Sequence, residues 1–388
     1  MNKEKRRVPK LRFPGFTEDW EQRKLGDVTN IKTGSRNQQD SVANGKYPFF
    51  IRSEKIEKLD AYDFDTEAIL VPGDGRIGEI FHYYNGKFAL HQRVYKVDDF
   101  KGVDAFYLLY LFQCKFKEHA LRLNAQGTVP SLRLPMFTEW NIDIPSLQEQ
   151  ICIGRLLNKI ELMITLHQRK LEHLKLKKKA LLQKLFPKNG ERYPELRFPG
   201  FTDAWEQCKL SDILVERNEQ QVETNEYPLM SFVQGYGVIP KGERYDRSFL
   251  VLDQSKKYKR TELGDFIYSS NNLETGSIGI NKTGKAVISP VYSIFYGVSI
   301  GDSQFIGIMS LLPRFIAKMI RFRQGVVYGQ WRIHEKDFLD ISILIPSVDE
   351  RTKITKLILS LEELITLHQR KLDHLQLQKK ALLQQMFV

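Results

Sequence analysis

Internal duplication is the feature that most constrains how this chain folds. The stretch LRFPGFT begins at Leu11 and again at Leu196, 185 positions apart. A second stretch, ITLHQRKL, begins at Ile164 and again at Ile365, 201 positions apart. Because two motifs recur in the same order, the chain contains two copies of one structural plan. The unequal offsets make the second copy 16 residues longer between its shared ends.

Size and composition are those of a globular protein. The 388 residues suggest two or three domains, and 42% hydrophobic with 11% aromatic residues is not typical of disorder. No apolar run reaches the length of a membrane span, and the basic N-terminus lacks the apolar stretch of a signal peptide. The net charge of +12 favours a polyanionic partner such as nucleic acid, although charge alone is a weak indicator.

The cysteines indicate a reducing compartment. Cys114, Cys152 and Cys208 stand at unrelated positions of the two copies, and their number is odd. This pattern is typical of a cytoplasmic protein with neither a disulfide framework nor a metal cluster. We therefore predict no metal site.

Apolar residues at alternating spacings of four and three predict two long helices with a coiled-coil seam. Ser146 with Glu149, and Ser347 with Glu350, are capping-box signals at the two helix starts. The predicted seam residues are Ile153, Leu157, Ile160, Ile164, His167, Leu171, Leu174, Leu181, Leu185, Ile354, Ile358, Leu361, Ile365, His368, Leu372, Leu375, Leu382 and Met386.

Each helix of about 40 residues is roughly 60 Å long and needs a partner for its seam. We expect the two helices to pack on one another, antiparallel; a homodimer in which each helix pairs with its own copy is the alternative. His167 and His368 more plausibly fix the register than catalyse a reaction. The lysine-rich run LKLKKKALLQK is either a solvated helix face or a grip on DNA.

A further apolar set lies off the seam. These residues either widen the seam or form a docking surface for another protein, and they are Leu156, Met163, Leu166, Leu357, Leu364 and Leu367.

Two variable segments, roughly 30–143 and 215–344, lie between the repeated parts. Each contains short strand patterns and a helical stretch, and Pro313 should kink or split the second of these helical stretches. The fold class expected is therefore α/β (α+β), with two small mixed domains.

Side chains suited to DNA occur in both segments. Arginine suits guanine, Asn and Gln suit adenine, and hydroxyls suit phosphate, although any single one is more commonly an ordinary loop residue. The candidates are Lys32, Arg36, Asn37, Gln38, Arg76, Gln92, Arg93, Gln126, Thr128, Ser131, Arg133, Arg217, Asn218, Gln234, Tyr236, Asn271, Asn272, Tyr292, Gln324, Tyr328, Gln330 and Arg332.

The duplicated LRFPGF segments, the IPS…EQ and IPS…ER helix starts, the ITLHQRKL helices and the two divergent segments together resemble the specificity subunit of type I restriction–modification systems. The likeness covers essentially the whole chain. It implies a circularly permuted repeat with a pseudo-two-fold axis, in which two long antiparallel coiled-coil helices separate two target recognition domains. The expected boundaries are 1–145 and 188–346 for these domains, and 146–187 and 347–388 for the helices.

The resemblance also implies a function. Each recognition domain would read one half of a bipartite DNA target, and the helices would set the gap between the halves. Two adenine-N6 methyltransferase subunits and ATP-driven restriction subunits would be the partners, in the bacterial cytoplasm, as a defence against foreign DNA. S-adenosylmethionine, ATP and Mg²⁺ would belong to those partners and no cofactor to this chain.

Two other classes of function are weighed against this one. A methyltransferase acting alone should carry an Asn/Asp-Pro-Pro-Tyr/Phe motif, and the sequence contains no Pro-Pro dipeptide, no P-loop and no helicase-like segment. A coiled-coil scaffold without a role in DNA binding would explain the helices but not the two divergent polar segments. We therefore expect a DNA-recognition subunit that is not itself an enzyme.

Overall fold

The structure is a computed structural model that describes residues 6–124, 130–233, 237–240, 256–273, 277–299, 301–327 and 330–388. Its contacts divide the chain into two compact units. Unit 1 is Met1–Lys170 with His368–Val388, and unit 2 is Leu171–Leu367. Each unit combines one variable segment with parts of both long helices.

Unit 1 is built on a six-stranded sheet in the order β2, β7, β5, β6, β3, β4. Neighbouring strands are antiparallel except β3 and β6, which are parallel. Residues 68–71 of β5 are fully buried, as expected for the AILV run. The strands are β2 (Asn30–Thr33), β3 (Tyr47–Phe50), β4 (Ile56–Leu59), β5 (Phe64–Pro72), β6 (His82–Leu90) and β7 (Val94–Asp98).

Helices pack on this sheet through an aromatic core. The predicted helical stretch is continuous from 105 to 123, with a π-helical turn at its centre, and Asp104 caps its start by accepting a hydrogen bond from Tyr107 N (2.8 Å). Phe112 and Phe116 of the π turn pack against Trp140. The helical elements are α1 (Leu25–Val28), η1 (Gln38–Asp40), α2 (Ala105–Leu111), η2 (Phe112–Phe116), α3 (Lys117–Leu123) and α4 (Leu134–Thr138).

Unit 2 has smaller sheets instead of one large sheet. The largest has the order β10, β18, β15, β16, and a second has the order β11, β14, β17. Its strands are β10 (Leu214–Glu216), β11 (Gln220–Gln221), β12 (Met230–Val233), β13 (Gly237–Pro240), β14 (Tyr258–Thr261), β15 (Phe266–Tyr268), β16 (Ile278–Ile280), β17 (Ala286–Ile288), β18 (Ser293–Gly297), β19 (Gln324–Val327) and β20 (Gln330–Arg332). The predicted α/β class is confirmed for both units.

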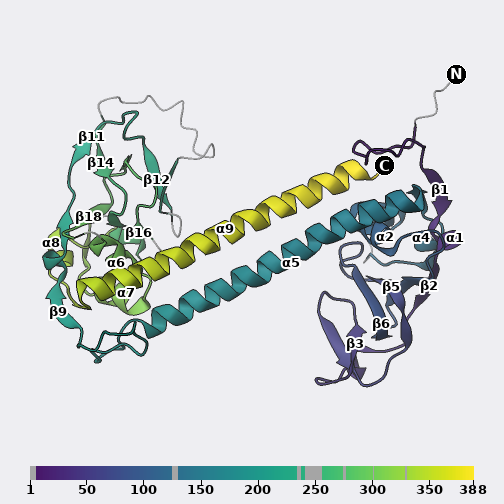
Figure 1. Cartoon of the computed structure of the whole chain (residues 1–388), viewed down its shortest axis with the longest axis horizontal. Coiled ribbons are helices and arrows are strands. Elements are labelled where there is room, and N and C mark those ends of the chain that lie inside the picture. The colour runs from purple at the N-terminus through teal and green to yellow at the C-terminus, as the bar shows by residue number, and fades with distance from the viewer. Residues whose placement is uncertain are drawn as a thin grey trace. The chain divides into compact units, whose positions relative to one another are not determined.

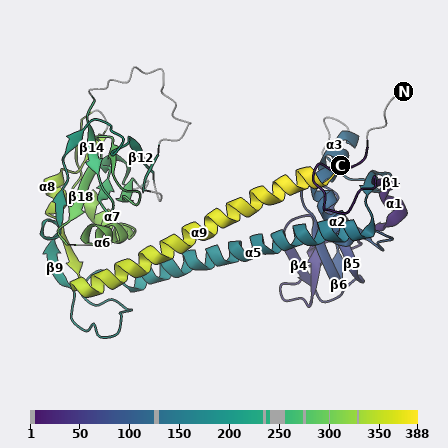
Figure 2. The same ribbon diagram turned by 45° about the horizontal axis from the view of Figure 1, so that its top comes forward.

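Short helices cover the larger sheet of unit 2, where α6 lies against β16 and β18 (Figure 2). The predicted break at Pro313 is confirmed, because Pro313 is the first residue of α7 and α6 ends four residues earlier. The helical elements are η3 (Leu210–Asp212), η5 (Ser270–Asn272), α6 (Asp302–Met309), α7 (Pro313–Ile320) and α8 (Glu335–Leu339).

The two long helices are α5 (Leu147–Lys184) and α9 (Val348–Met386). Every predicted seam residue is buried or half-buried. In unit 1, Lys379 Nζ lies 2.5 Å from Glu161 Oε2, and in unit 2 the equivalent Lys178 Nζ lies 2.5 Å from Glu362 Oε1. Within each unit the helices therefore pack on one another in opposite directions, and the seam is filled from within one chain (Figure 1).

Ser146 and Ser347 accept hydrogen bonds from the backbone N–H of Glu149 and Glu350 (3.4 Å each), as expected for helix caps. The carboxylates of these glutamates do not complete a capping box. Arg12 donates to both carboxylate oxygens of Glu149 at 2.8 Å, and Arg197 donates to both oxygens of Glu350 at 2.9 and 2.6 Å.

The repeated segments 11–24 and 196–209, here called the lead segments, thus bind the start of one helix. Each also binds the end of the other helix. Leu11 N donates to Gln385 O of α9 in unit 1, and Leu196 N donates to Lys184 O of α5 in unit 2, both at 2.9 Å. The lead segments continue into strands β1 (Glu21–Lys24) and β9 (Glu206–Lys209). These pair antiparallel with β8 (Asn141–Ile144) and β21 (Ser342–Ile345), the strands just before the long helices.

This repeated framework agrees with the predicted circular permutation. In unit 2 the lead segment follows α5 along the chain, whereas in unit 1 it meets the end of α9 without a covalent link. The units do not coincide with the predicted domain boundaries, because each long helix is divided between them after Lys170 and before His368. Each half-helix is grouped with the globular segment on which it packs.

Candidate nucleic-acid interface

Candidates of the first variable segment gather on two loops that are tied together. Gln92 N donates to Arg36 O at 2.9 Å, and Gln92 Nε2 donates to Asn37 Oδ1 at 2.7 Å. Arg36 is half-buried and its Nε donates to Asp63 at 2.9 Å, which raises the pKa of Arg36. Asn37 and Gln92 are exposed, so their amides form the outer surface of this patch while Arg36 positions the loop.

A second group of candidates surrounds Gly73. Gly73 N donates to Arg93 O at 2.7 Å, and Leu132 N donates to Gly73 O at 2.6 Å. Ser131 forms an isolated β-bridge with Asp74. The loops that carry Arg93 and Ser131 are therefore neighbours, although nearly 40 residues separate them in the sequence.

The remaining described candidates of unit 1 lie at the surface. Arg76 is exposed and pairs with Glu54 (2.9 Å) and Glu79 (2.8 Å). Such exposed pairs are weak, so a phosphate could displace them. The other exposed candidates are Lys32, Gln38 and Arg133. Gln126 and Thr128 lie outside the described residues.

In unit 2 a polar hollow of about 730 Å³ brings candidates together. Segments from β10, β14, η5, β18, the β19–β20 hairpin and α8 line it. Ile333 N donates to Ser270 Oγ at 2.9 Å, which ties the chain after the hairpin to η5. The candidates at its lining are Asn218, Asn271, Gln324 and Arg332.

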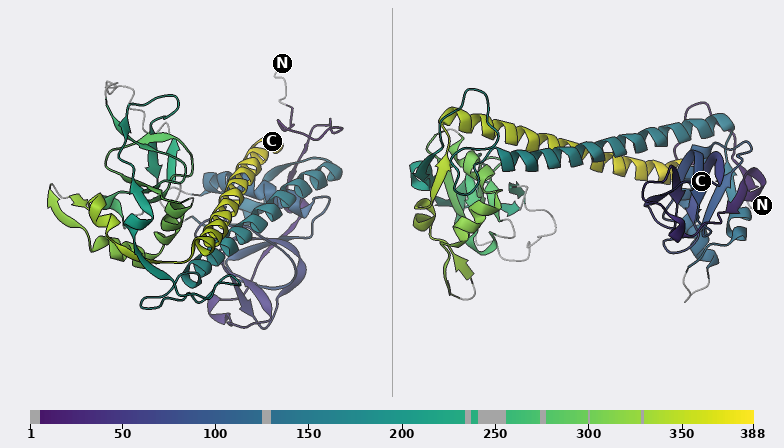
Figure 3. Two further views of the ribbon diagram at one scale, coloured as in Figure 1. Left: turned by 60° about the vertical axis from the view of Figure 1, so that its left-hand side comes forward. Right: turned by 90° about the horizontal axis from the view of Figure 1, so that it is seen from below.

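The hairpin formed by β19 and β20 projects from the rest of unit 2 (yellow-green, Figure 3). Gln324 and Arg332 are paired across it. Gln324 Nε2 donates to Asp337 Oδ2 of α8 at 2.6 Å, so the base of the hairpin is fixed to that helix. The exposed Trp331 lies beside Arg332 at the rim of the hollow.

Two candidates support the fold instead of facing solvent. The Arg217 side chain is 11% exposed, and its Nε donates to Asp265 Oδ2 at 2.8 Å. Burial raises the pKa of Asp265, and the hydrogen bonds from Arg217 oppose that shift. Tyr292 is half-buried and packs on Phe232, with ring centroids 5.6 Å apart. Both side chains are therefore occupied within the unit.

The other candidates of the second segment are less defined. The backbones of Asn272 and Gln330 belong to η5 and β20, while Gln234, Tyr236 and Tyr328 lie outside the described residues. Sequence analysis missed several lining residues, namely Glu216, Gln220, Lys259, Trp331, His334 and Glu335. In the sequence, Trp331 between Gln330 and Arg332 has the aromatic–polar mixture typical of nucleic-acid surfaces. The two glutamates carry no such signal, because they are neither cations nor amides.

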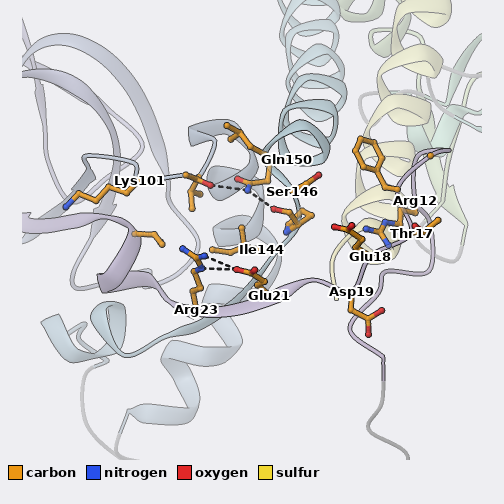
Figure 4. A pocket seen from close by; sticks show the side chains of 17 residues that line it. Arg12, Thr17, Glu18, Asp19, Glu21, Arg23, Lys101, Ile144, Ser146 and Gln150 are labelled. Carbon is orange, nitrogen blue, oxygen red and sulfur yellow. Dashed lines mark hydrogen bonds and ion pairs between the residues drawn. The ribbon is translucent and has the colours of Figure 1, made fainter.

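A second pocket, of about 480 Å³, belongs to the framework of unit 1 (Figure 4). It lies where the lead segment meets the start of α5. Gln150 Nε2 donates to Pro145 O at 2.9 Å and to Gly102 O at 3.2 Å, and Arg23 pairs with Glu21. The Gln150 bonds join the helix start to the loop at 101–103, and the Arg12–Glu149 pair joins the lead segment to the same helix start. This pocket is therefore part of the framework and not of the loops that carry the variable segment's candidates.

The helix pair leaves part of the predicted docking set exposed. Met163, Leu166, Leu364 and Leu367 are 40%, 66%, 43% and 47% exposed, respectively. Leu156 and Leu357 are instead half-buried against the cores of unit 1 and unit 2, so these two widen the core and are not available for docking. The same exposed pattern recurs at Leu176 and Leu377, which sequence analysis did not include.

Among the described residues, no three side chains of His, Cys, Asp or Glu are grouped so that they could hold a metal ion. Within the same residues, none of the helices has the length and apolar character needed to cross a membrane.

Comparison with known proteins gives one consistent similarity. Residues 17–176 match the family described as the type I restriction modification DNA specificity domain. The specificity subunit of the type I restriction enzyme MjaVIII from Methanocaldococcus jannaschii is 24% identical over 404 residues, spanning 96% of this chain and 92% of that protein. This chain is similar to the specificity subunits of type I restriction enzymes, and residues 17–176 match the DNA specificity domain of that family.

Two further proteins are similar to this chain. The EcoDI specificity subunit of Escherichia coli is 27% identical over 207 residues, a match that spans 52% of this chain but only 45% of the relative. The solved type I S subunit from M. genitalium superposes with a TM-score of 0.70 at 15% identity, covering 98% of this chain and 99% of that one. That structure supports the same fold for 98% of this chain.

Proposed function

We propose that this chain is a specificity subunit that recognises DNA for a type I restriction–modification complex, and that each of its variable segments reads one half of a bipartite, asymmetric target. One observation carries the proposal. The same framework, with its Arg12–Glu149 and Arg197–Glu350 pairs, holds two variable segments whose sheets differ. Two different recognition surfaces in one frame suit two different half-sites.

The chemistry of the variable segments supports DNA as the ligand. Exposed amides such as Asn37 and Gln92 can pair with adenine edges, and exposed Arg76 and Arg332 can contact guanine or phosphate. The net charge of +12 supplies sequence-independent affinity. Because binding to phosphates releases counterions, that part of the affinity should fall steeply with salt.

The long helices support a fixed spacing between the half-sites. A helix of 38 or 39 residues is a stiff element of about 57 Å, and within each unit the seam joins α5 to α9. In proteins that read two half-sites, the distance between the reading elements sets the spacing of the sites. We therefore assign the gap length to the helix pair.

Two adenine-N6 methyltransferase subunits are the proposed partners on the helices. The exposed Met163, Leu166, Leu364 and Leu367 occupy equivalent positions of the two copies, so one kind of partner could bind twice. Restriction subunits would complete the nuclease. S-adenosylmethionine, ATP and Mg²⁺ would be held by these partners, because this subunit is not a catalyst and its relatives are named for specificity.

Sequencing of modified adenines in cells that carry the complete system tests the proposal. We expect one bipartite motif with a fixed gap. Exchange of residues 30–143 for the same region of a relative should then change one half of the motif only. A segment exchange that alters both halves of the motif contradicts the proposal. The proposal also fails if the complex modifies no defined motif.

A further inference from the structure

The polar hollow of unit 2 contains a carboxylate with spare hydrogen-bonding capacity. Glu335, the first residue of α8, accepts a hydrogen bond from Ser293 Oγ at Oε1 (2.8 Å), and Lys259 Nζ lies 3.8 Å from the same oxygen. Among the described residues, Arg332 Nη2 is a cation near Oε2, also at 3.8 Å. That separation is too long for a hydrogen bond, so Oε2 can still accept one from a ligand.

Glu335 is negatively charged at neutral pH. Burial alone would raise the pKa of Glu335, but hydrogen bonds from its own backbone N–H and from Ser293, together with the charges of Lys259 and Arg332, lower the pKa. Glu216 faces the same hollow, and burial together with the charge of Glu335 raises the pKa of Glu216. The inner part of the hollow therefore presents carboxylate acceptors, with the cations Lys259 and Arg332 beside them.

The chemistry of the Glu335 carboxylate selects what can bind to Oε2. A phosphate ester carries acceptors and no donor, so it cannot pair with this oxygen, whereas the exposed amides of Asn218 and Asn271 at the lining suit uncharged polar groups. A carboxylate accepts hydrogen bonds and cannot donate them. In the major groove the donors of DNA are the amino groups of cytosine (N4) and adenine (N6).

The neighbouring hairpin gives the hollow access to a groove. A two-stranded β-ribbon fits the major groove of B-DNA. The β19–β20 ribbon carries Arg332 and the 46% exposed Trp331 at the rim, and it projects from the unit (Figure 3). A ribbon in the groove would bring base edges to Glu335 while Arg332 remains near the backbone.

We propose that Glu335 is a specificity-determining residue, which accepts a hydrogen bond from the exocyclic amino group of a cytosine or adenine in the half-site read by unit 2. Glu335 thereby takes the donor of a base edge and not an oxygen of the phosphate backbone. This inference rests on the proposed function, since it assigns a chemical preference to one position of that half-site.

The test is Glu335→Gln in the complete restriction–modification system, with modified adenines sequenced in cells. A carboxamide can rotate and donate, so the variant should also tolerate guanine or thymine, whose major-groove atoms accept, at one position. We expect discrimination at that position to fall about ten-fold in competition binding, with the other half-site unchanged. Glu226→Gln is the matched control, because Glu226 is exposed and pairs with Lys285 away from the hollow.

Ser293→Ala is the second variant, and it keeps the carboxylate but removes the hydrogen bond that orients it. We expect Ser293→Ala to reduce base discrimination at the same position of the half-site, but by less than Glu335→Gln does. Unfolding temperatures identify a variant that fails to fold, in which case Ser293→Ala alone decides. An unchanged motif with unchanged discrimination in the folded variants overturns the inference. If the wild-type system itself shows no bipartite motif, it is the proposed function that fails.

Discussion

Nδ1 of His167 lies 2.8 Å from Nδ1 of His368 in the seam between α5 and α9. One ring must donate and the other accept, so the contact exists only while at least one of these nitrogens is unprotonated. Burial, then the neighbouring His167, Lys371 and Lys170, lower the pKa of His368 below its usual 6.5. The pair therefore links the stability of the helix pair to pH.

The sign of this dependence follows from the lowered pKa. At pH values between the folded and unfolded pKa of His368, the unfolded chain binds more protons than the folded chain. The contribution of His368 to the unfolding free energy is therefore fully present above about pH 6.5, and it is lost as pH falls through the folded pKa. We expect His368→Asn to reduce the difference in unfolding free energy between about pH 7.5 and pH 5.5 by on the order of 1 kcal/mol. His173→Asn, at an exposed position of α5, is the control. Equal pH dependence in both variants would contradict the assignment.

The buried pair of Arg12 and Glu149 should dominate the attachment of the first lead segment. Their side chains are 15% and 1% exposed. Arg12→Ala leaves a buried carboxylate without its partner and should cost about 3–5 kcal/mol in urea unfolding. Arg23→Ala removes an exposed pair with Glu21 from the same segment and should cost less than about 1 kcal/mol. Similar costs for the two variants would show that the lead segment is held by other contacts.

Docking of the methyltransferase subunits can be tested on the exposed helix surface. The double variant Leu166→Glu with Leu367→Glu should weaken co-purification of those subunits at least ten-fold, because two apolar contacts are replaced by charges. Folding should be unaffected, since both leucines are largely exposed. Leu162→Glu is a control supplied by the repeat itself, because the equivalent position already holds Glu363. Loss of binding in the control as well would argue against a specific docking surface.

The helix pair can be lengthened to test its role in spacing. Insertion of four residues into α5 and four into α9 lengthens each helix by about 6 Å. We expect the modified motif to show a longer gap while both half-site sequences stay the same. Sequencing of modified adenines reads both properties at once. If the lengthened variant folds and its motif keeps the original gap, the helix pair does not set the spacing between the half-sites.

The repeated framework was predictable from the sequence because its signals are local and occur twice. The spacing of Ile153, Leu157 and their equivalents fixes a helix face, and Ser146 and Ser347 mark the helix starts. The Arg12–Glu149 contact was not predictable, since the partners are 137 residues apart and Glu149 was expected to cap its own helix. Duplication shows that a residue matters to the frame but does not show which residue it meets.

The recognition surfaces were predictable only as residue types. Arg217 and Asn218 are adjacent, yet Arg217 binds the buried Asp265 and Asn218 lines the hollow. Glu335 reaches the hollow because β18 and the β19–β20 hairpin fold beside α8, a meeting of segments that no local pattern encodes. Composition identified cations and amides, while packing decides which of them reach solvent.

His167 and His368 hold equivalent positions of the two copies, so here a residue faces its own duplicate. A lysine or glutamate at this point would confront a like charge, and an alanine would leave an empty space on both sides at once. This position favours a side chain that can pair with an identical side chain. Imidazole does so because one ring donates a hydrogen bond and the other ring accepts it.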